Sequence, residues 1–247
     1  MRVDEYVETL RVDGLSLAAA AQHAGLTAPI AGCPGWLVRD LLTHLGGVHR
    51  WAAAHLRTQS PEPLPDNEFF TAPADDTTVL EWFRTGHHDL VETLKAANPA
   101  MHCWTFLPTR SPLAFWARRQ AHETAIHRAD VEATTCAVSS WTPAFAVDGV
   151  NELVKDLFAG SQRLATNPPT SIALSARDAG VAWTLMLDHT GLRVQDGFHP
   201  ATLTIEGTAS DLYLLLWNRT GLDRLDTTGD QQALETWRTK AKITRDP

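Results

Sequence analysis

The segment HETAIH, residues 122–127, carries the side chains best suited to chemistry in this sequence. It is one residue longer than the H-E-x-x-H signature of zinc proteases, in which two histidines four apart share a helix face beside a glutamate base. His122 and His127 are five apart, which separates them by about 140° around a helix. Glu123 and His127 are four apart and point the same way, so this pair is the one suited to share a cation.

A cation held by this pair needs a further ligand from another helix, as in bundles whose metal sites are built from facing helices. His44 is the best of the eleven histidines because it lies on the apolar-rich face of a predicted helix. Zinc accepts imidazole nitrogen and carboxylate oxygen, and a catalytic zinc has three protein ligands and an open position. The spacing alone leaves an alternative open, because Glu and His four apart also form ordinary surface pairs.

Helical periodicity predicts the elements that carry these residues. Four segments have apolar residues at helical spacing, and breaks rich in Pro and Gly separate them. Amphipathic segments of this length predict a four-helix bundle. The predicted helices cover about 3–24, a segment that begins near Trp36, 77–97 and 112–134.

The pattern changes in the second half of the chain. One more helix is predicted over 146–166, and short alternating stretches bounded by Gly and Asp over 171–197 predict a strand meander. A strand and a helix follow within 201–221. We therefore expect an α+β protein, with a helical bundle at 1–140 and a smaller α+β domain at 141–247.

Composition excludes several function classes. Lys and Arg number 21 against 29 Asp and Glu, a net charge of −8, which disfavours nucleic acid because DNA binding needs a basic surface. The longest apolar runs, such as 212–217, are too short to cross a bilayer, and the charged N-terminus does not resemble a signal peptide. Cys33, Cys103 and Cys136 have no paired spacing, which favours a reducing compartment. We expect a cytoplasmic protein without nucleic-acid or membrane partners.

Two segments together closely resemble the signatures of the mycothiol-dependent maleylpyruvate isomerase family. In GCPGWLVRDLLTHLGGVHRW, the Cys-Pro-Gly-Trp run at 33–36 is followed by Asp40 and, four residues later, His44. WARRQAHETAIHRADVE resembles the second signature, with Glu123 four residues before His127. In the C-terminal half, DAGVAWTL, IEGTASDLYLLLWNR and TTGD resemble the family's second domain, which is similar to a sterol carrier protein.

The resemblance implies a DinB-like four-helix bundle in which His44, Glu123 and His127 bind one divalent ion, with zinc favoured and His122 an incidental neighbour. Asp40 lies one turn before His44, and Asp130 lies three residues after His127. Ligating histidines usually donate their second ring N–H to a carboxylate or a carbonyl, so either aspartate would suit that role. Ion pairs with neighbouring arginines are the equal alternative for both.

Arg219, in LLLWNRTG, is the approximate match to an arginine of the family's second domain that is thought to meet the substrate or the thiol. The resemblance therefore implies a catalytic role for Arg219. The alternative is an exposed arginine that interacts favourably with the C-terminus of a helix.

Other conspicuous side chains favour packing or solvent. His87 and His88 stand beside acidic residues, which predicts a solvated face. Neither Cys33 nor Cys103 has a basic neighbour that would favour a reactive thiolate. Four tryptophans are expected in the core or in a pocket wall: Trp36, Trp51, Trp104 and Trp116.

The resemblance implies a metal-dependent enzyme whose thiol cofactor, mycothiol, adds to a small electrophile such as maleylpyruvate. Elimination after bond rotation would make it an isomerase, whereas retention of the thiol would make it a transferase. The alternative is a non-catalytic carrier of an apolar ligand with a structural metal, which a fourth ligand such as His122 or a cysteine would favour. A hydrolase with Asp40 as general base is a third hypothesis. We expect a monomer or a weak homodimer.

Overall fold

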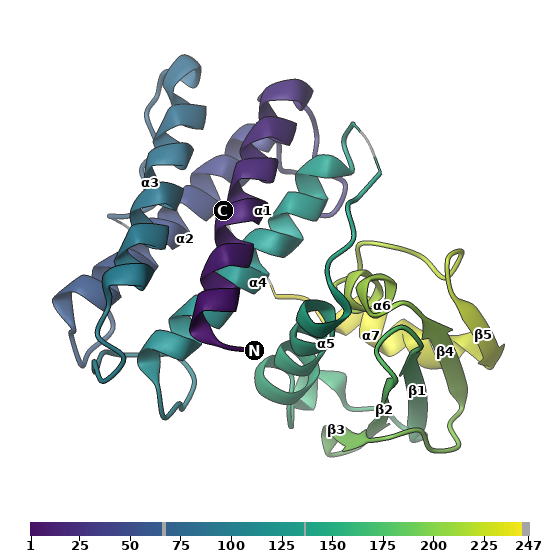
Figure 1. The fold of residues 1–247 in the computed structure, drawn as a ribbon. Helices are drawn as coiled ribbons and strands as arrows, with labels where there is room; N and C mark the ends of the chain where they lie inside the picture. The colour runs from purple at the N-terminus through teal and green to yellow at the C-terminus, as the bar shows by residue number, and fades with distance from the viewer. Residues whose placement is uncertain (66–67, 136, 244–247) are drawn as a thin grey trace. The chain divides into compact units, whose positions relative to one another are not determined.

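The computed structural model describes residues 1–65, 68–135 and 137–243, in two compact units, Met1–Ser139 and Ser140–Pro247. The described part contains seven α-helices and a five-stranded mixed sheet, which confirms the predicted α+β class (Figure 1). None of its helices is both long and apolar enough to span a bilayer.

Four long helices form the first unit, and Figure 1 shows them running alongside one another as a bundle. Local chemistry explains where two of them begin. The Asp75 carboxylate accepts a hydrogen bond from the Thr77 N–H at 2.9 Å, and Ser111 caps the next helix just before Pro112. The helices are α1 (Val3–Ala24), α2 (Val38–Thr58), α3 (Asp76–Ala96) and α4 (Pro112–Glu132).

Apolar side chains of all four helices meet in one core, to which α4 contributes Val131. Leu41 and Leu45 of α2 are fully buried in a cluster with Leu17 of α1 and Phe83 of α3. Burial of each such side chain contributes about 2 kcal/mol. Helix α4 differs, because many of its polar side chains are buried as well. These are Arg119, Gln120, His122, Thr124, His127, Arg128, Asp130 and Glu132.

His87 corrects the expectation of a solvated histidine pair. It is buried, and its Nε2 lies 3.0 Å from the Leu10 carbonyl oxygen, whereas His88 is exposed. Gly14 allows this approach, because a Cβ there would lie 2.2 Å from the imidazole. The prediction was wrong because it relied on the acidic neighbours. His87 lies one turn after the buried Phe83, and this position on the helix decides that its side chain is buried.

An aromatic cluster encloses His55 of α2. Its ring stacks on Trp104 at 5.0 Å and on Trp116 at 5.3 Å, and Trp51 approaches it edge-on at 5.0 Å. Neither ring nitrogen has a hydrogen-bond partner among the described residues. Burial lowers the pKa of His55 to about 4, so the imidazole is neutral at physiological pH.

The second unit is built on a sheet with the strand order β3-β2-β1-β4-β5, in which β1 and β4 are parallel and the other pairs are antiparallel. Ile172 is buried and pairs with Leu185 on one side and Leu203 on the other, so one face of the sheet is apolar. The strands are β1 (Thr170–Ala176), β2 (Val181–Asp188), β3 (Gly191–Asp196), β4 (Leu203–Gly207) and β5 (Asp226–Gly229).

The helices of the second unit differ from the predicted ones. The helix expected over 146–166 is α5 (Pro143–Asn151) continued by a π-helical segment (Glu152–Leu157), and it ends before Gly160, whose φ is 66°. Helix α6 (Ala209–Leu216) contacts β1 and β4. The single turn at Gln162–Leu164 lies within the segment predicted as one helix but is separate from α5, whereas the single turn at Gln231–Leu234 and the short helix α7 (Glu235–Lys240) had no sequence prediction.

We predict that His55 makes the protein less stable in acid. Its folded-state pKa is depressed, so the unfolded chain binds more protons below about pH 6.5, and stability is lost as the pH falls from about 6.5 toward 4. Between about pH 7.5 and pH 5 the wild type should lose about 2 kcal/mol more than His55→Phe, which keeps an aromatic ring. Urea unfolding followed by far-ultraviolet circular dichroism measures this difference, and equal losses would contradict the assignment.

Candidate metal site

Helices α2 and α4 bring His44, Glu123 and His127 together. The Nε2 atoms of His44 and His127 lie 3.4 and 3.5 Å from the same oxygen, Oε1 of Glu123. Most N–H···O hydrogen bonds are shorter, about 2.7–3.2 Å. Two ligands of a tetrahedral ion at about 2.0–2.1 Å lie about 3.3 Å apart. The three side chains therefore have the spacing of cation ligands.

The triad has three potential ligand atoms within 4.8 Å of one another, and no other His, Cys, Asp or Glu in the described ranges joins it at that distance. His122 of the same motif lies elsewhere on α4, with its ring 6.2 Å from the ring of Tyr6. Three protein ligands and an open position are typical of a catalytic zinc site, whereas structural sites are closed by a fourth ligand.

Asp130 contacts the second ring nitrogen of His127. Its Oδ2 lies 3.0 Å from His127 Nδ1, and its side chain is almost fully buried. The Cys33 thiol donates to the same Oδ2 at 3.5 Å. Cys33, His127 and Asp130 form a second group of potential ligands, but 3.0 Å is an ordinary hydrogen-bond length. Asp130 therefore has the geometry of an outer-shell partner that turns Nε2 of His127 toward the triad.

Asp40 has a different role from either one expected for it. Its Oδ2 accepts a hydrogen bond from the Leu37 N–H at 2.8 Å, at the N-terminus of α2, where a negative charge is favourable. The structure shows no hydrogen bond or ion pair between Asp40 and His44 among the residues it describes. The neighbouring Arg39 pairs with Asp76 instead.

Charge is balanced around the triad by buried groups. Burial would raise the pKa of Glu123, but its contacts with His127 and His44 and the charge of Arg119 hold that pKa well below the usual value. Arg119 donates to Glu123 Oε2 at 2.9 Å. Burial would lower the pKa of His127, but its contacts with Asp130, Cys33 and Glu123 hold it well above the usual value. A cation at Nε2 of His127 would therefore displace a proton.

Aromatic rings flank the histidines of the triad. The Trp36 ring lies 5.0 Å from that of His44 and 6.4 Å from that of His127, nearly parallel to the latter at 18°. Phe70 lies 5.9 Å from the His44 ring. Gly47 allows Phe70 to come close, because a Cβ at Gly47 would lie 2.6 Å from the Phe70 ring.

Family models match both halves of the chain. The model for the mycothiol maleylpyruvate isomerase N-terminal domain matches residues 7–132, and the model for the corresponding C-terminal domain matches residues 144–236. The chain belongs to the mycothiol maleylpyruvate isomerase family. A comparison with curated proteins gives no match.

Two solved structures support the fold of this family member. The crystal structure of the mycothiol-dependent maleylpyruvate isomerase has a TM-score of 0.67 and 11% identity, with 92% of this chain and 93% of that chain covered. A histidine-to-alanine mutant of that isomerase gives a TM-score of 0.67, 10% identity and the same coverage. At such low identity the likeness demonstrates the fold alone, and it agrees with the resemblance read from the sequence.

Arg219 lies in the second unit of this family member, after the end of α6. Its Nη1 donates to the Trp217 carbonyl oxygen at 2.8 Å, and its N–H donates to the Leu214 carbonyl oxygen. The role expected for Arg219 toward substrate or thiol stays a prediction. Of the other cysteines, Cys103 has a pKa that burial raises, which disfavours a thiolate, and Cys136 lies outside the described residues.

The sequence reasoning did not identify three neighbours of the triad: Arg119, Trp36 as a ring beside both histidines, and Phe70. Arg119 stands four residues before Glu123 in α4, so its ion pair could have been predicted from spacing. Phe70 belongs to the loop between α2 and α3, where no periodicity indicates which side chains point inward.

We predict that Asp130→Asn weakens zinc binding by about ten- to a hundredfold, because it removes the negative charge that orients His127 and increases its basicity. Asp40→Asn is the matched control and should change the affinity less than about twofold, since Asp40 contacts the backbone of Leu37 instead. Competition with a chromophoric zinc chelator measures both affinities. Equal effects of the two substitutions would exclude the outer-shell role of Asp130.

Proposed function

We propose that this protein is a metal-dependent, mycothiol-using isomerase that acts on a small, maleylpyruvate-like electrophile in the cytoplasm. The observation that supports this proposal best is the set of three potential ligands, His44, Glu123 and His127, in a chain of this family. His44 and His127 would hold a divalent ion, with zinc favoured, through Nε2, and Glu123 would do so through Oε1. When bound, the ion supplies a positive charge that favours the ionised form of a thiol.

The protein's own groups prepare the site for this chemistry. When an ion is bound and His127 is neutral, Asp130 would keep the imidazole proton on Nδ1, which leaves the Nε2 lone pair for the ion. Arg119 neutralises the outer oxygen of Glu123, so the carboxylate stays ionised although it is only partly exposed. The rings of Trp36 and Phe70 lie beside His44 and make its surroundings partly apolar. Together, these contacts would favour binding of a thiolate sulfur to an ion held by the triad.

The isomerisation leaves the atomic composition of the substrate unchanged. The thiolate sulfur adds to the double bond conjugated with a carbonyl, a C–S bond forms, and the electron pair moves to the carbonyl oxygen. The former double bond rotates as a single bond. The electron pair then returns, the C–S bond breaks, and the trans product and the thiolate are regenerated. A transferase would instead protonate the carbon and keep the C–S bond; family membership favours the isomerase. Arg219 is proposed to contact the substrate or the thiol.

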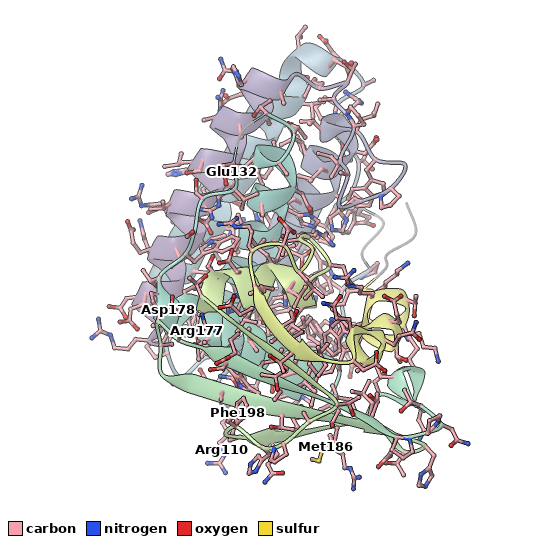
Figure 2. The ribbon with its side chains drawn as sticks, turned by 90° about the vertical axis from the view of Figure 1, so that its right-hand side faces the viewer. Arg110, Glu132, Arg177, Asp178, Met186 and Phe198 are labelled. Carbon is pink, nitrogen blue, oxygen red and sulfur yellow. The ribbon has the colours of Figure 1, made fainter. Side chains whose placement is uncertain are left out.

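The carrier hypothesis has less support. The second unit has a depression of about 570 Å³ lined by the π-helical segment and by β2 and β3, but this depression is open and has Lys155 and Arg193 in its wall. Met186, which also lines it, projects outward from the sheet in Figure 2. Sites for small apolar ligands usually bury most of the ligand surface. The hydrolase hypothesis also weakens, because Asp40 contacts the backbone at a helix N-terminus instead of the triad.

The metal assignment predicts about one divalent ion, zinc, per chain purified without added metal. His44→Ala and His127→Ala should each lower the occupancy, because each removes one of three ligands, and the double variant should carry almost none. His122→Ala is the matched control and should keep the ion, since its ring packs beside Tyr6. Elemental analysis by mass spectrometry measures the occupancy. Full occupancy in the double variant would exclude the triad as the site.

The thiol assignment predicts that mycothiol binds the zinc-loaded protein and releases close to one proton at neutral pH, because the reference pKa of a thiol is about 8.5. Calorimetry in two buffers of different ionisation enthalpy counts that proton, and metal-free protein is the control. Nuclear magnetic resonance should then show maleylpyruvate converted to its trans isomer only when mycothiol and metal are both present. Conversion without mycothiol, or no thiol binding, would contradict the proposal.

A further inference from the structure

Trp36 is the aromatic side chain best placed to touch a molecule bound at the triad. Its ring lies beside both histidines, at 5.0 Å from His44 and 6.4 Å from His127. A molecule that binds an ion held by these histidines would therefore lie next to the indole. Trp36 also lies on the family's Cys-Pro-Gly-Trp run, for which the proposed chemistry gives no role.

The backbone of Trp36 is held in place while its side chain stays accessible. Its N–H donates to the Cys33 carbonyl oxygen, and its carbonyl oxygen accepts from the Ile30 N–H, both at 2.9 Å. The ring packs in part against the apolar core of the bundle and is half-buried. The preceding Gly35 has a φ of 91°, and a Cβ there would meet no atom within 4 Å, so the loop faces open space.

The indole N–H separates Trp36 from the tryptophans of the core. Trp51 donates its Nε1–H to the Leu64 carbonyl oxygen at 3.2 Å, and Trp116 donates to the Trp104 carbonyl oxygen at 3.1 Å. The structure shows no hydrogen bond from the Trp36 indole to any residue that it describes. Buried tryptophans usually satisfy this donor within the protein. The donor of Trp36 is therefore left for solvent or for a bound molecule.

A partly exposed indole whose N–H has no partner among the described residues suits a carbohydrate. The C–H groups of a sugar ring pack on the aromatic face, and a sugar hydroxyl accepts from the N–H. Mycothiol carries its cysteine on an amino sugar joined to inositol, so it offers such rings a short distance from its sulfur. We propose that Trp36 binds the carbohydrate part of the thiol and thereby selects mycothiol over simpler thiols. This inference rests on the proposed function.

The test compares two thiols on zinc-loaded protein by calorimetry: mycothiol, and N-acetylcysteine, which lacks the sugar and inositol rings. The wild type should bind mycothiol at least about tenfold more tightly. Trp36→Ala should weaken mycothiol binding by about five- to tenfold and change N-acetylcysteine binding less than about twofold. Trp36→Phe, which keeps an aromatic face but loses the N–H, should bind mycothiol with an affinity between those of the wild type and Trp36→Ala. Phe198→Ala, which removes a 54% exposed aromatic ring, should match the wild type.

Zinc content and circular dichroism, measured on every variant, verify that the site and the fold survive. Equal loss of both thiols in Trp36→Ala would overturn the inference, because Trp36 would then act only through the histidines beside it. Equal affinity of the wild type for both thiols would overturn it as well and leave the proposed function intact. Binding of neither thiol by zinc-loaded wild type would overturn the proposed function and this inference with it.

Discussion

The Glu123 carboxylate is the group on which the arrangement of the bundle depends. A charge held mainly within a protein costs several kcal/mol unless other groups compensate it. Arg119 contacts one of its oxygens, while the other faces two imidazoles at distances longer than most hydrogen bonds. In the proposed site, a cation between His44, Glu123 and His127 would complete the compensation. Helix α4, which carries Glu123 and His127, must therefore face α2, which carries His44.

The same requirement recurs along α4, because its other buried polar groups also need partners. The Arg128 guanidinium donates to Asp13 of α1 at 2.9 Å and to the Ser139 carbonyl oxygen. The Thr124 hydroxyl lies 2.9 Å from Nε2 of His49 on α2. These polar contacts connect α4 to two neighbouring helices and to the end of the unit. A helix with so few exposed residues keeps its orientation through directional contacts as well as apolar packing.

Much of the fold could be predicted because hydrophobic periodicity records helical phase, and the four long helices lie close to the predicted segments. The triad followed from spacing combined with the resemblance. Spacing and the resemblance could not distinguish the roles of Asp40 and Asp130, since each stands about one turn from a histidine. Position in the helix separates them: Asp40 is in the first turn, where free N–H groups attract a carboxylate, whereas Asp130 is far from such donors. Loop residues such as Phe70 have no periodicity to read.

The close contact between Gly47 and Phe70 has an evolutionary consequence. The ring occupies the space in which a side chain at Gly47 would lie, and it borders His44. Natural variation at these two positions should therefore be correlated, although the C-terminal half of α2 and the loop after it separate them in the chain. Relatives with a larger residue in place of Gly47 would need a small residue or a different loop path at position 70. The wall of the site, and with it the range of accepted molecules, would then diverge between lineages while the ligand set stayed the same.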